Sequence, residues 1–182
     1  GEAYDKVGRV LNLPYPGGPV LDKMASLGNN TYDLPVPLDD DSYNFSFSGL
    51  KSAVINLNHK AYLRHEEINK NDLAASFQNV VITSLVNKTI KAAKAYNVKQ
   101  VMMAGGVSAN RGLRNAMNEA VSKLDNVELL LPPMGCCTDN AMMIALAAKE
   151  MYDLQIFSDL SLGIKPNIDL QQESVSEVKH NG

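Results

Sequence analysis

The chain has 182 residues, which allows one large domain or two small ones, and its hydrophobic content of 45% is enough for a buried core. A formal net charge of -3 and a pI near 5.6 exclude a general basic surface for nucleic acid, so such a contact would need a local patch or a partner. No apolar run approaches the roughly 18 residues of a membrane span, and the first five residues lack the basic and apolar segments of a signal peptide.

Apolar residues at helical spacing, separated by proline and glycine, predict two short helices at the start of the chain. The chain begins with Gly1 in place of methionine, inside the first helix, so we expect a fragment of a longer protein. The acidic run within residues 35–43 predicts a solvated loop. The first half is expected to contain helices over 4–11 and 20–27, with Gly28 as the stop of the second, a strand over 44–49 and a helix from Leu50.

The second half alternates helices with buried apolar runs. Asn71 or Asp72 is expected to cap a long helix that ends near residue 96. The elements that follow are strands over 98–103 and 127–131 and helices over 111–124 and 141–151, and the polar tail 171–182 is expected to be disordered. Helices that connect two buried strands predict an α/β unit with a parallel strand pair.

The stretch V-K-Q-V-M-M-A-G-G-V-S-A-N at 98–110 stands at the centre of this unit. A strand that ends in Gly105 and Gly106 and turns into a helix brings backbone N–H groups and a helix N-terminus together, which suits the phosphates or sugar of a nucleotide. The alternative is a tight turn that needs glycine only for its dihedral angles. The motif alone leaves both interpretations open.

A second unusual stretch, T-D-N at 138–140, follows the other predicted strand, and Thr138 or Asp139 is expected to cap the last helix. Ligands of parallel sheets collect at the carboxyl ends of the strands. We therefore expect this stretch, the glycine pair and Asn110 to face one crevice.

Other polar residues allow two interpretations each. Lys51 near a helix start either binds an anion or faces solvent. His59 and His65 are expected on the surface, without a partner at metal-binding spacing. The two cysteines, Cys136 and Cys137, are adjacent and cannot staple a fold, which indicates a reducing cytoplasm. A thiolate–metal role is the alternative to packing for this pair.

Five motifs in order resemble the carboxyl half of the bacterial TsaD family, the tRNA N6-adenosine threonylcarbamoyltransferases, formerly called O-sialoglycoprotein endopeptidases. They are G-E-A-Y-D-K-V-G-R at 1–9, Y-P-G-G-P at 15–19, F-S-F-S-G-L-K-S-A at 45–53, A-G-G-V-S-A-N-R-G-L-R at 104–114 and C-T-D-N-A-M-M-I-A at 137–145.

The resemblance implies an actin-like, sugar-kinase-like (ribonuclease H-like) lobe with a mixed, partly parallel sheet flanked by helices. Residues 1–170 would be the carboxyl-terminal lobe of a two-lobe cytoplasmic enzyme whose amino lobe is absent. The family transfers the threonylcarbamoyl group from threonylcarbamoyl-AMP to N6 of adenosine 37 in tRNAs that read ANN codons, which forms t6A.

By the same resemblance, Asp5 and Gly18 hold the ribose and adenylate part of the ligand, Asn110 also binds the ligand, and the backbone of Gly105 and Gly106 packs beside Asn110. Aspartate can accept hydrogen bonds from ribose hydroxyls, and paired glycines let a base or phosphate approach the backbone. No catalytic residue is assigned in this half, because the rest of the site would lie in the missing lobe.

Asp139 matches the metal ligand of the family, where one divalent iron or zinc ion would act as a Lewis acid. The paired histidines of the amino lobe are absent, and His59, His65 and His180 match nothing in that motif. Asp139 alone cannot hold the ion firmly. We therefore expect the isolated chain to have lost the metal, to be inactive and to bind nucleotide weakly at most.

The implied partners are TsaB, the ATPase TsaE and tRNA, with Lys51, Arg111 and Arg114 as the expected tRNA contacts. One alternative is a non-catalytic actin-like nucleotide-binding module for assembly or regulation. Another is a kinase or carbamoyltransferase of the same superfamily. A metalloprotease is disfavoured, because no H-E-x-x-H motif is present.

Overall fold

The computed structural model describes residues 1–38, 40–161 and 163, and it divides the chain into two compact units. The first unit runs from Gly1 to Thr138, and the second begins at Asp139. The prediction that residues 1–170 form one lobe therefore stays a prediction.

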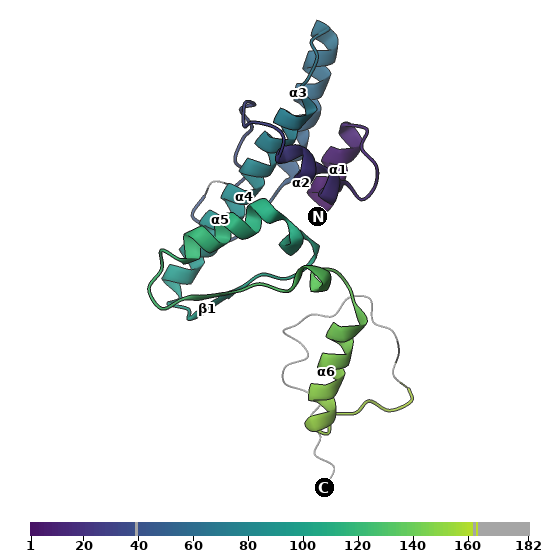
Figure 1. Cartoon of the computed structure of the whole chain (residues 1–182), viewed down its shortest axis with the longest axis vertical. Helices are drawn as coiled ribbons and strands as arrows, with labels where there is room; N and C mark the ends of the chain where they lie inside the picture. The colour runs from purple at the N-terminus through teal and green to yellow at the C-terminus, as the bar shows by residue number, and fades with distance from the viewer. Residues whose placement is uncertain (39, 162, 164–182) are drawn as a thin grey trace. The chain divides into compact units, whose positions relative to one another are not determined.

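Five α-helices and two strands make up the described part of the first unit (Figure 1). The long helix α4 packs against α2 and α5, and α1 packs against α2 and α3. The elements are α1 (Glu2–Val10), α2 (Gly17–Ala25), α3 (Ser48–Arg64), α4 (Lys70–Ala95), β1 (Gln100–Met102), α5 (Arg111–Val121) and β2 (Glu128–Leu130), with short 3-10 turns at Gly106–Ala109 and Met134–Cys136.

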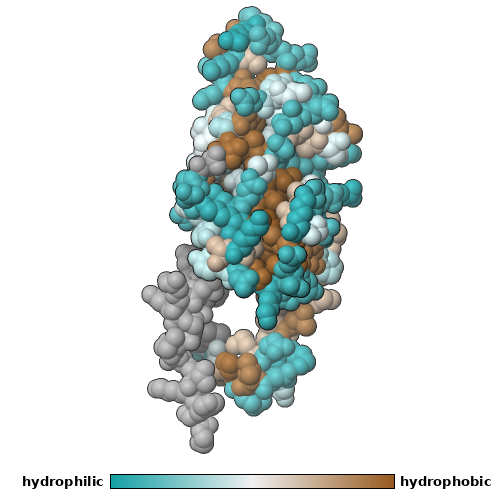
Figure 2. All heavy atoms as spheres, turned by 90° about the vertical axis from the view of Figure 1, so that its left-hand side faces the viewer, coloured by the Kyte–Doolittle hydropathy of each residue, from teal (hydrophilic) through white to brown (hydrophobic). Residues whose placement is uncertain are grey.

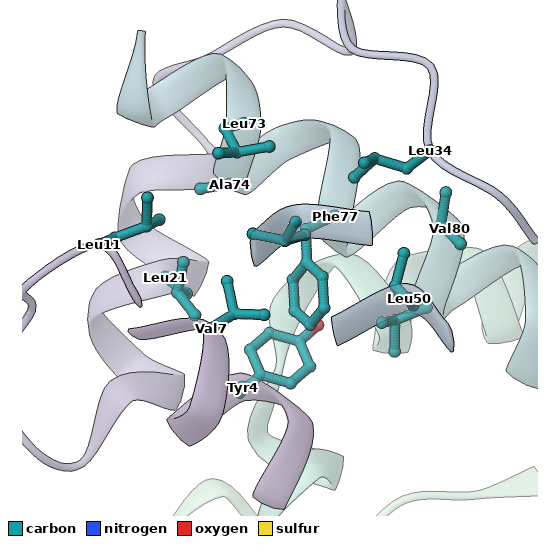
Figure 3. Close-up of a cluster of buried hydrophobic side chains, with 12 residues drawn as sticks. Tyr4, Val7, Leu11, Leu21, Leu34, Leu50, Leu73, Ala74, Phe77 and Val80 are labelled. Atoms are coloured by element: carbon teal, nitrogen blue, oxygen red, sulfur yellow. The ribbon is translucent and has the colours of Figure 1, made fainter. Parts of the chain in front are cut away.

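The core of the helical part forms where α1, α2, α3 and α4 meet (Figure 3). Phe77 is fully buried at its centre, and its ring packs edge-on against Tyr4 with ring centroids 5.1 Å apart. Val7, Leu21 and Leu50 close around the two rings. Burial of these side chains holds α1 and α2 onto α4, which fixes the residues at the start of both short helices.

The sheet consists of β1 and β2, which run parallel in the register Gln100↔Glu128, Val101↔Leu129 and Met102↔Leu130. This confirms the predicted parallel pair. Val101 is buried in a second core with α5, whereas Met102 on the opposite face is 71% exposed. The sheet is not mixed within the part of the chain that the structure describes, where these are the only strands.

The strand predicted over residues 44–49 is wrong. Ser48 already begins α3, and the residues before it lie in an irregular segment. Phe47 packs against the helical core, but Phe45 stays exposed. An alternating pattern forms a strand only beside another strand, and no neighbour pairs with this segment among the described residues.

The helix boundaries also correct several predictions. The side chain of Asn69 caps α4 by accepting bonds from the N–H groups of Asn71 and Asp72, so neither of the expected caps serves. Helix α2 begins at Gly17 and ends before Ser26. Gly28 is therefore not its stop, and a Cβ at Gly28 would instead collide with the backbone of Asn71.

The acidic loop is paired with α4 and not simply solvated. Lys88 is buried and donates to Asp40 Oδ1 at 2.8 Å and to the Ser42 carbonyl at 3.0 Å. Lys91 binds Asp41 at 2.9 Å. The hydrogen bonds from Lys88 and Ser42 hold the pKa of Asp40 below its ordinary value.

The second unit contains helix α6 (Ala141–Asp153), whose residues are all exposed. Its N-cap is Asn140, which accepts from the N–H of Met143 at 3.0 Å, so the expected caps Thr138 and Asp139 are wrong.

Apolar side chains are also exposed among hydrophilic ones elsewhere on the surface (Figure 2). No helix within the described residues has the length and hydropathy to cross a membrane. The predicted disordered tail 171–182 lies outside the described residues.

Candidate nucleotide site

The start of α2 is built against α1. Asp5 Oδ1 accepts a hydrogen bond of 2.8 Å from the N–H of Gly17, the first residue of α2. A Cβ at Gly17 would lie 3.0 Å from the Tyr4 carbonyl oxygen, so only glycine allows this close approach. The carboxylate also stands at a helix N-terminus, where negative charge is favourable.

Gly18 differs from Gly17, because a Cβ there would meet no described atom within 4 Å. Asp22 follows one helical turn later, on the same face of α2. Its Oδ1 accepts bonds from Asn110 Nδ2 at 2.8 Å and from Gln78 Nε2 at 3.2 Å. Its Oδ2 has no bonding partner among the described residues. The first two turns of α2 therefore contain a glycine with space beside it and a carboxylate with one oxygen that has no hydrogen bond from the described residues.

Asn110 is buried and uses both ends of its amide. Its Oδ1 caps α5 by accepting from the N–H of Leu113 at 2.8 Å. Its Nδ2 donates to Asp22 Oδ1 and, also at 2.8 Å, to Gln78 Oε1. The Tyr4 hydroxyl donates to the same Gln78 oxygen at 3.5 Å. Burial, and then the charge of Asp22, raises the pKa of Tyr4 well above its ordinary value, so the hydroxyl remains a donor.

The glycine pair forms the turn that leads from β1 to α5. Gly105 has φ +79°, a value that favours glycine, so its dihedral requirement is confirmed. The turn is held by bonds from the N–H of Ser108 to the Gly105 carbonyl at 2.9 Å and from the N–H of Asn110 to the Val107 carbonyl at 3.0 Å. Both glycines are exposed, so the turn also leaves its backbone accessible.

The structure therefore connects three of the residues predicted from sequence. Asp5 holds the start of α2, Gly18 lies in its first turn, and Asn110 joins the helix through Asp22. The sequence reasoning missed Asp22, although its spacing from Gly18 puts both on one helical face. It also missed Gln78, which lies within the apolar stripe of α4 and has no distinguishing pattern.

Asp139 is exposed and begins the second unit. Thr138, the last residue of the first unit, lies close to the glycine pair, with its Cγ2 3.9 Å from the position of a Cβ on Gly106. No group of three or more His, Cys, Asp or Glu side chains in the described part of the chain could hold a metal ion. The donors present do not fit a metal site by themselves, and the predicted meeting of Asp139 with Gly105 stays a prediction.

The residues expected to contact tRNA differ in their surroundings. Arg111 is exposed and Lys51 is half-buried. Arg114 is half-buried and donates to the carbonyls of Ser108 and Pro132 and, at 3.3 Å, to the sulfur of Cys137.

The two cysteines differ in burial. Cys137 is buried and donates to the Pro133 carbonyl at 3.5 Å, whereas Cys136 is half-buried. The described structure thus gives Cys137 a packing role, and it does not assemble a thiolate–metal group around either residue.

Comparison with known proteins places the chain in a family. The sequence profile described as "TsaD: tRNA N6-adenosine threonylcarbamoyltransferase" matches residues 1–146. A tRNA N6-adenosine threonylcarbamoyltransferase of Geobacillus kaustophilus (strain HTA426) is 53% identical over 171 residues, which cover 93% of this chain and 50% of the relative. A protein of the same name from Bacillus cereus (strain ATCC 14579) is 54% identical over 172 residues, which cover 94% of this chain and 50% of the relative.

The match thus extends over nearly the whole chain, and it includes Asp5, Gly18, Asp22, Asn110 and Asp139. The chain spans about half the length of these curated relatives. It belongs to the TsaD family of tRNA N6-adenosine threonylcarbamoyltransferases.

Proposed function

We propose that this chain supplies one half of the nucleotide site of an enzyme that forms t6A. The substrate would be threonylcarbamoyl-AMP, and the acceptor would be N6 of adenosine 37 in tRNAs that read ANN codons. In this reaction the N6 nitrogen forms a bond to the carbamoyl carbon, the bond from that carbon to the phosphate oxygen breaks, and AMP leaves while the nitrogen loses a proton.

The observation that carries the proposal is the hydrogen-bonded connection from Asp5 through α2 to Asp22 and Asn110. Both hydrogens of Asn110 Nδ2 are already used, so a ligand can only donate to its Oδ1. Asp5 and Asp22 each keep one oxygen without a bond from the described residues. A site made of acceptors suits a ligand with several hydroxyl donors, as a ribose is.

The remaining parts of the site suit the rest of an adenylate. Gly18 leaves space at the start of α2, and the exposed pair Gly105 and Gly106 lets a planar base or a phosphate approach the backbone. Helix α5, which begins directly after the turn, adds the positive end of its dipole. These features support the resemblance-based assignment of Asp5, Gly18 and Asn110 and add Asp22 to it.

Asp139 would contribute one oxygen ligand to a divalent iron or zinc ion whose other ligands come from the half of the relatives that this chain does not match. The ion would supply Lewis-acid chemistry when bound. The same half would complete the two-lobe, actin-like fold. TsaB, TsaE and tRNA are the proposed partners in the cytoplasm.

The test is a chimera in which this chain replaces the matching half of the Geobacillus kaustophilus relative. The chimera is supplied with TsaB, TsaE, threonylcarbamoyl-AMP and an unmodified tRNA, and t6A is measured by mass spectrometry of nucleosides. We expect t6A from the chimera and none from the chain alone. Asp22→Asn should lower the yield, whereas Asp125→Asn, at an exposed position after α5, should not.

Calorimetry with AMP distinguishes the alternatives. A chimera that binds AMP but makes no t6A would refute the transferase and favour a non-catalytic nucleotide-binding module. A folded chimera that binds no AMP would refute the nucleotide site itself.

A further inference from the structure

We propose that Arg114 is a positioning residue that fastens the loop after β1 to the loop after β2 and so holds the glycine turn in its ligand-binding shape. This inference rests on the proposed function for its catalytic consequence. The fastening itself is a property of the first unit alone, since all of its members lie within residues 1–138.

The backbone bonds between the two strands reach as far as the bond from the N–H of Met103 to the Leu130 carbonyl, at 3.1 Å. Beyond this point the guanidinium of Arg114 connects the two loops by hydrogen bonds. Its Nε donates to the carbonyl of Ser108 in the first loop, and its Nη2 donates to the carbonyl of Pro132 and the sulfur of Cys137 in the second. A single side chain thus bonds both strand ends.

The position of Arg114 on α5 makes this fastening effective. The backbone N–H of Arg114 donates to the carbonyl of Asn110 at 3.1 Å, and its side chain donates to the carbonyl of Ser108, two residues before Asn110. Ser108 is only 1% exposed, and its hydroxyl has no bond among the described residues. Removal of the Arg114 side chain would take this bond from the Ser108 carbonyl, and we expect the turn to rearrange as a result.

Only arginine fits this role. Its planar fork directs several N–H groups in fixed directions, whereas lysine carries a point charge that cannot span two loops in the same geometry. No carboxylate forms an ion pair with Arg114 in the part of the chain that the structure describes. Its partners are carbonyls and a thiol, as expected for a connector.

The enzymatic test uses Arg114→Lys and Arg114→Met in the chimera, with Arg64→Lys and Arg64→Met as matched controls at an exposed position in α3. We expect both Arg114 variants to raise the KM for threonylcarbamoyl-AMP by roughly 10- to 100-fold, because a displaced turn misplaces the ligand. The KM for tRNA should stay within about twofold of the parent, since fastening acts on the adenylate side only. The Arg64 variants should change neither constant.

Two enzymatic outcomes would overturn the proposal. Recovery of the parent KM by Arg114→Lys, with a change in the KM for tRNA and its salt dependence in Arg114→Met, would make Arg114 a phosphate contact. A fall in kcat with both KM values unchanged would indicate only a loss of folded enzyme.

The structural test uses this chain alone in a Cys136→Ala background. Arg114→Lys should increase hydrogen exchange at the amides of residues 105–110 and 134–137 and speed the labelling of Cys137 by a thiol reagent, and Arg64→Lys should do neither. Unchanged exchange in both loops would refute the fastening, whatever the activity. Increased exchange combined with an inactive parent chimera would refute the proposed function and leave the fastening standing.

Discussion

The amide of Asn110 joins α5 to α2 and α4, and replacing it tests whether the candidate site is also a structural joint. Asn110→Ala removes the cap of α5, which contributes about 1 kcal/mol. It also removes a bond to Gln78, for about 1 kcal/mol, and a bond to the carboxylate of Asp22, for about 1.5 kcal/mol because that group is charged. The opening free energy of α5 should fall by roughly 3 to 4 kcal/mol.

Two further variants separate these contributions. Asn110→Ser retains a capping oxygen and loses both donors, so it should be about 1 kcal/mol more stable than Asn110→Ala. Asn110→Asp retains the cap but sets a second carboxylate against Asp22 Oδ1, where Nδ2 now lies at 2.8 Å. Like charges raise the folded-state pKa of the pair, so this variant should lose stability as the pH rises through that pKa and recover it in acid.

The assay is hydrogen exchange of the α5 amides under conditions where exchange reports the opening equilibrium. It is preferable to one global unfolding curve, because the chain has two compact units and is not expected to unfold in one step. The reasoning fails if Asn110→Ala costs less than about 1 kcal/mol, or if the Ala and Ser variants are equally stable.

Three other outcomes are expected. Phe77→Ala should lower the opening free energy of α4, measured by hydrogen exchange of its amides, by about 3 to 5 kcal/mol, because Phe77 is fully buried between α1 and α4. A loss no larger than that of a substitution at an exposed position would contradict the assignment of Phe77 to the core. Gly17→Ala should destabilise the chain by crowding the Tyr4 carbonyl, whereas Gly18→Ala should leave thermal stability unchanged and weaken AMP binding by the chimera. The pKa of Asp40 is lower in the folded state than its ordinary value of 3.8, so the ionised carboxylate stabilises the fold at pH values above 3.8. This stabilisation is lost as the pH falls through the folded-state pKa. Asp40→Asn should therefore flatten the acid limb of a stability–pH curve measured by circular dichroism.

Regular elements were predictable where a strong period coincides with local chemistry. The 26-residue helix α4 and the parallel pair β1–β2 follow from apolar spacing and from the glycine turn between β1 and α5. The caps were predicted less well, because N-D and T-D-N sequences offer neighbouring residues that can each accept from a backbone N–H. Asn69 and Asn140 are the caps because each is the last residue before its helix begins, and the composition of the segment does not reveal that boundary.

Long-range pairing was the harder part. The segment 44–49 has a strand-like alternation, yet it leads into α3 because no second strand lies beside it in the described structure. Asp40 and Asp41 resemble a solvated run, but Lys88 and Lys91 lie opposite them about 50 residues later. Neither outcome depends on local sequence, since both are decided by what the fold brings alongside.

The polar residues of the candidate site follow the same principle. Sequence reasoning selected Asn110 and Arg114 for what a ligand or tRNA could take from them. In the structure the amide nitrogen of Asn110 donates to Asp22 and Gln78, and the guanidinium of Arg114 donates to carbonyls in two loops. What these bonds leave unfilled is a set of oxygen acceptors around the start of α2. In the proposed nucleotide site, hydroxyl donors on the ligand would therefore meet these oxygens, and the donors inside the protein would hold the oxygens in place.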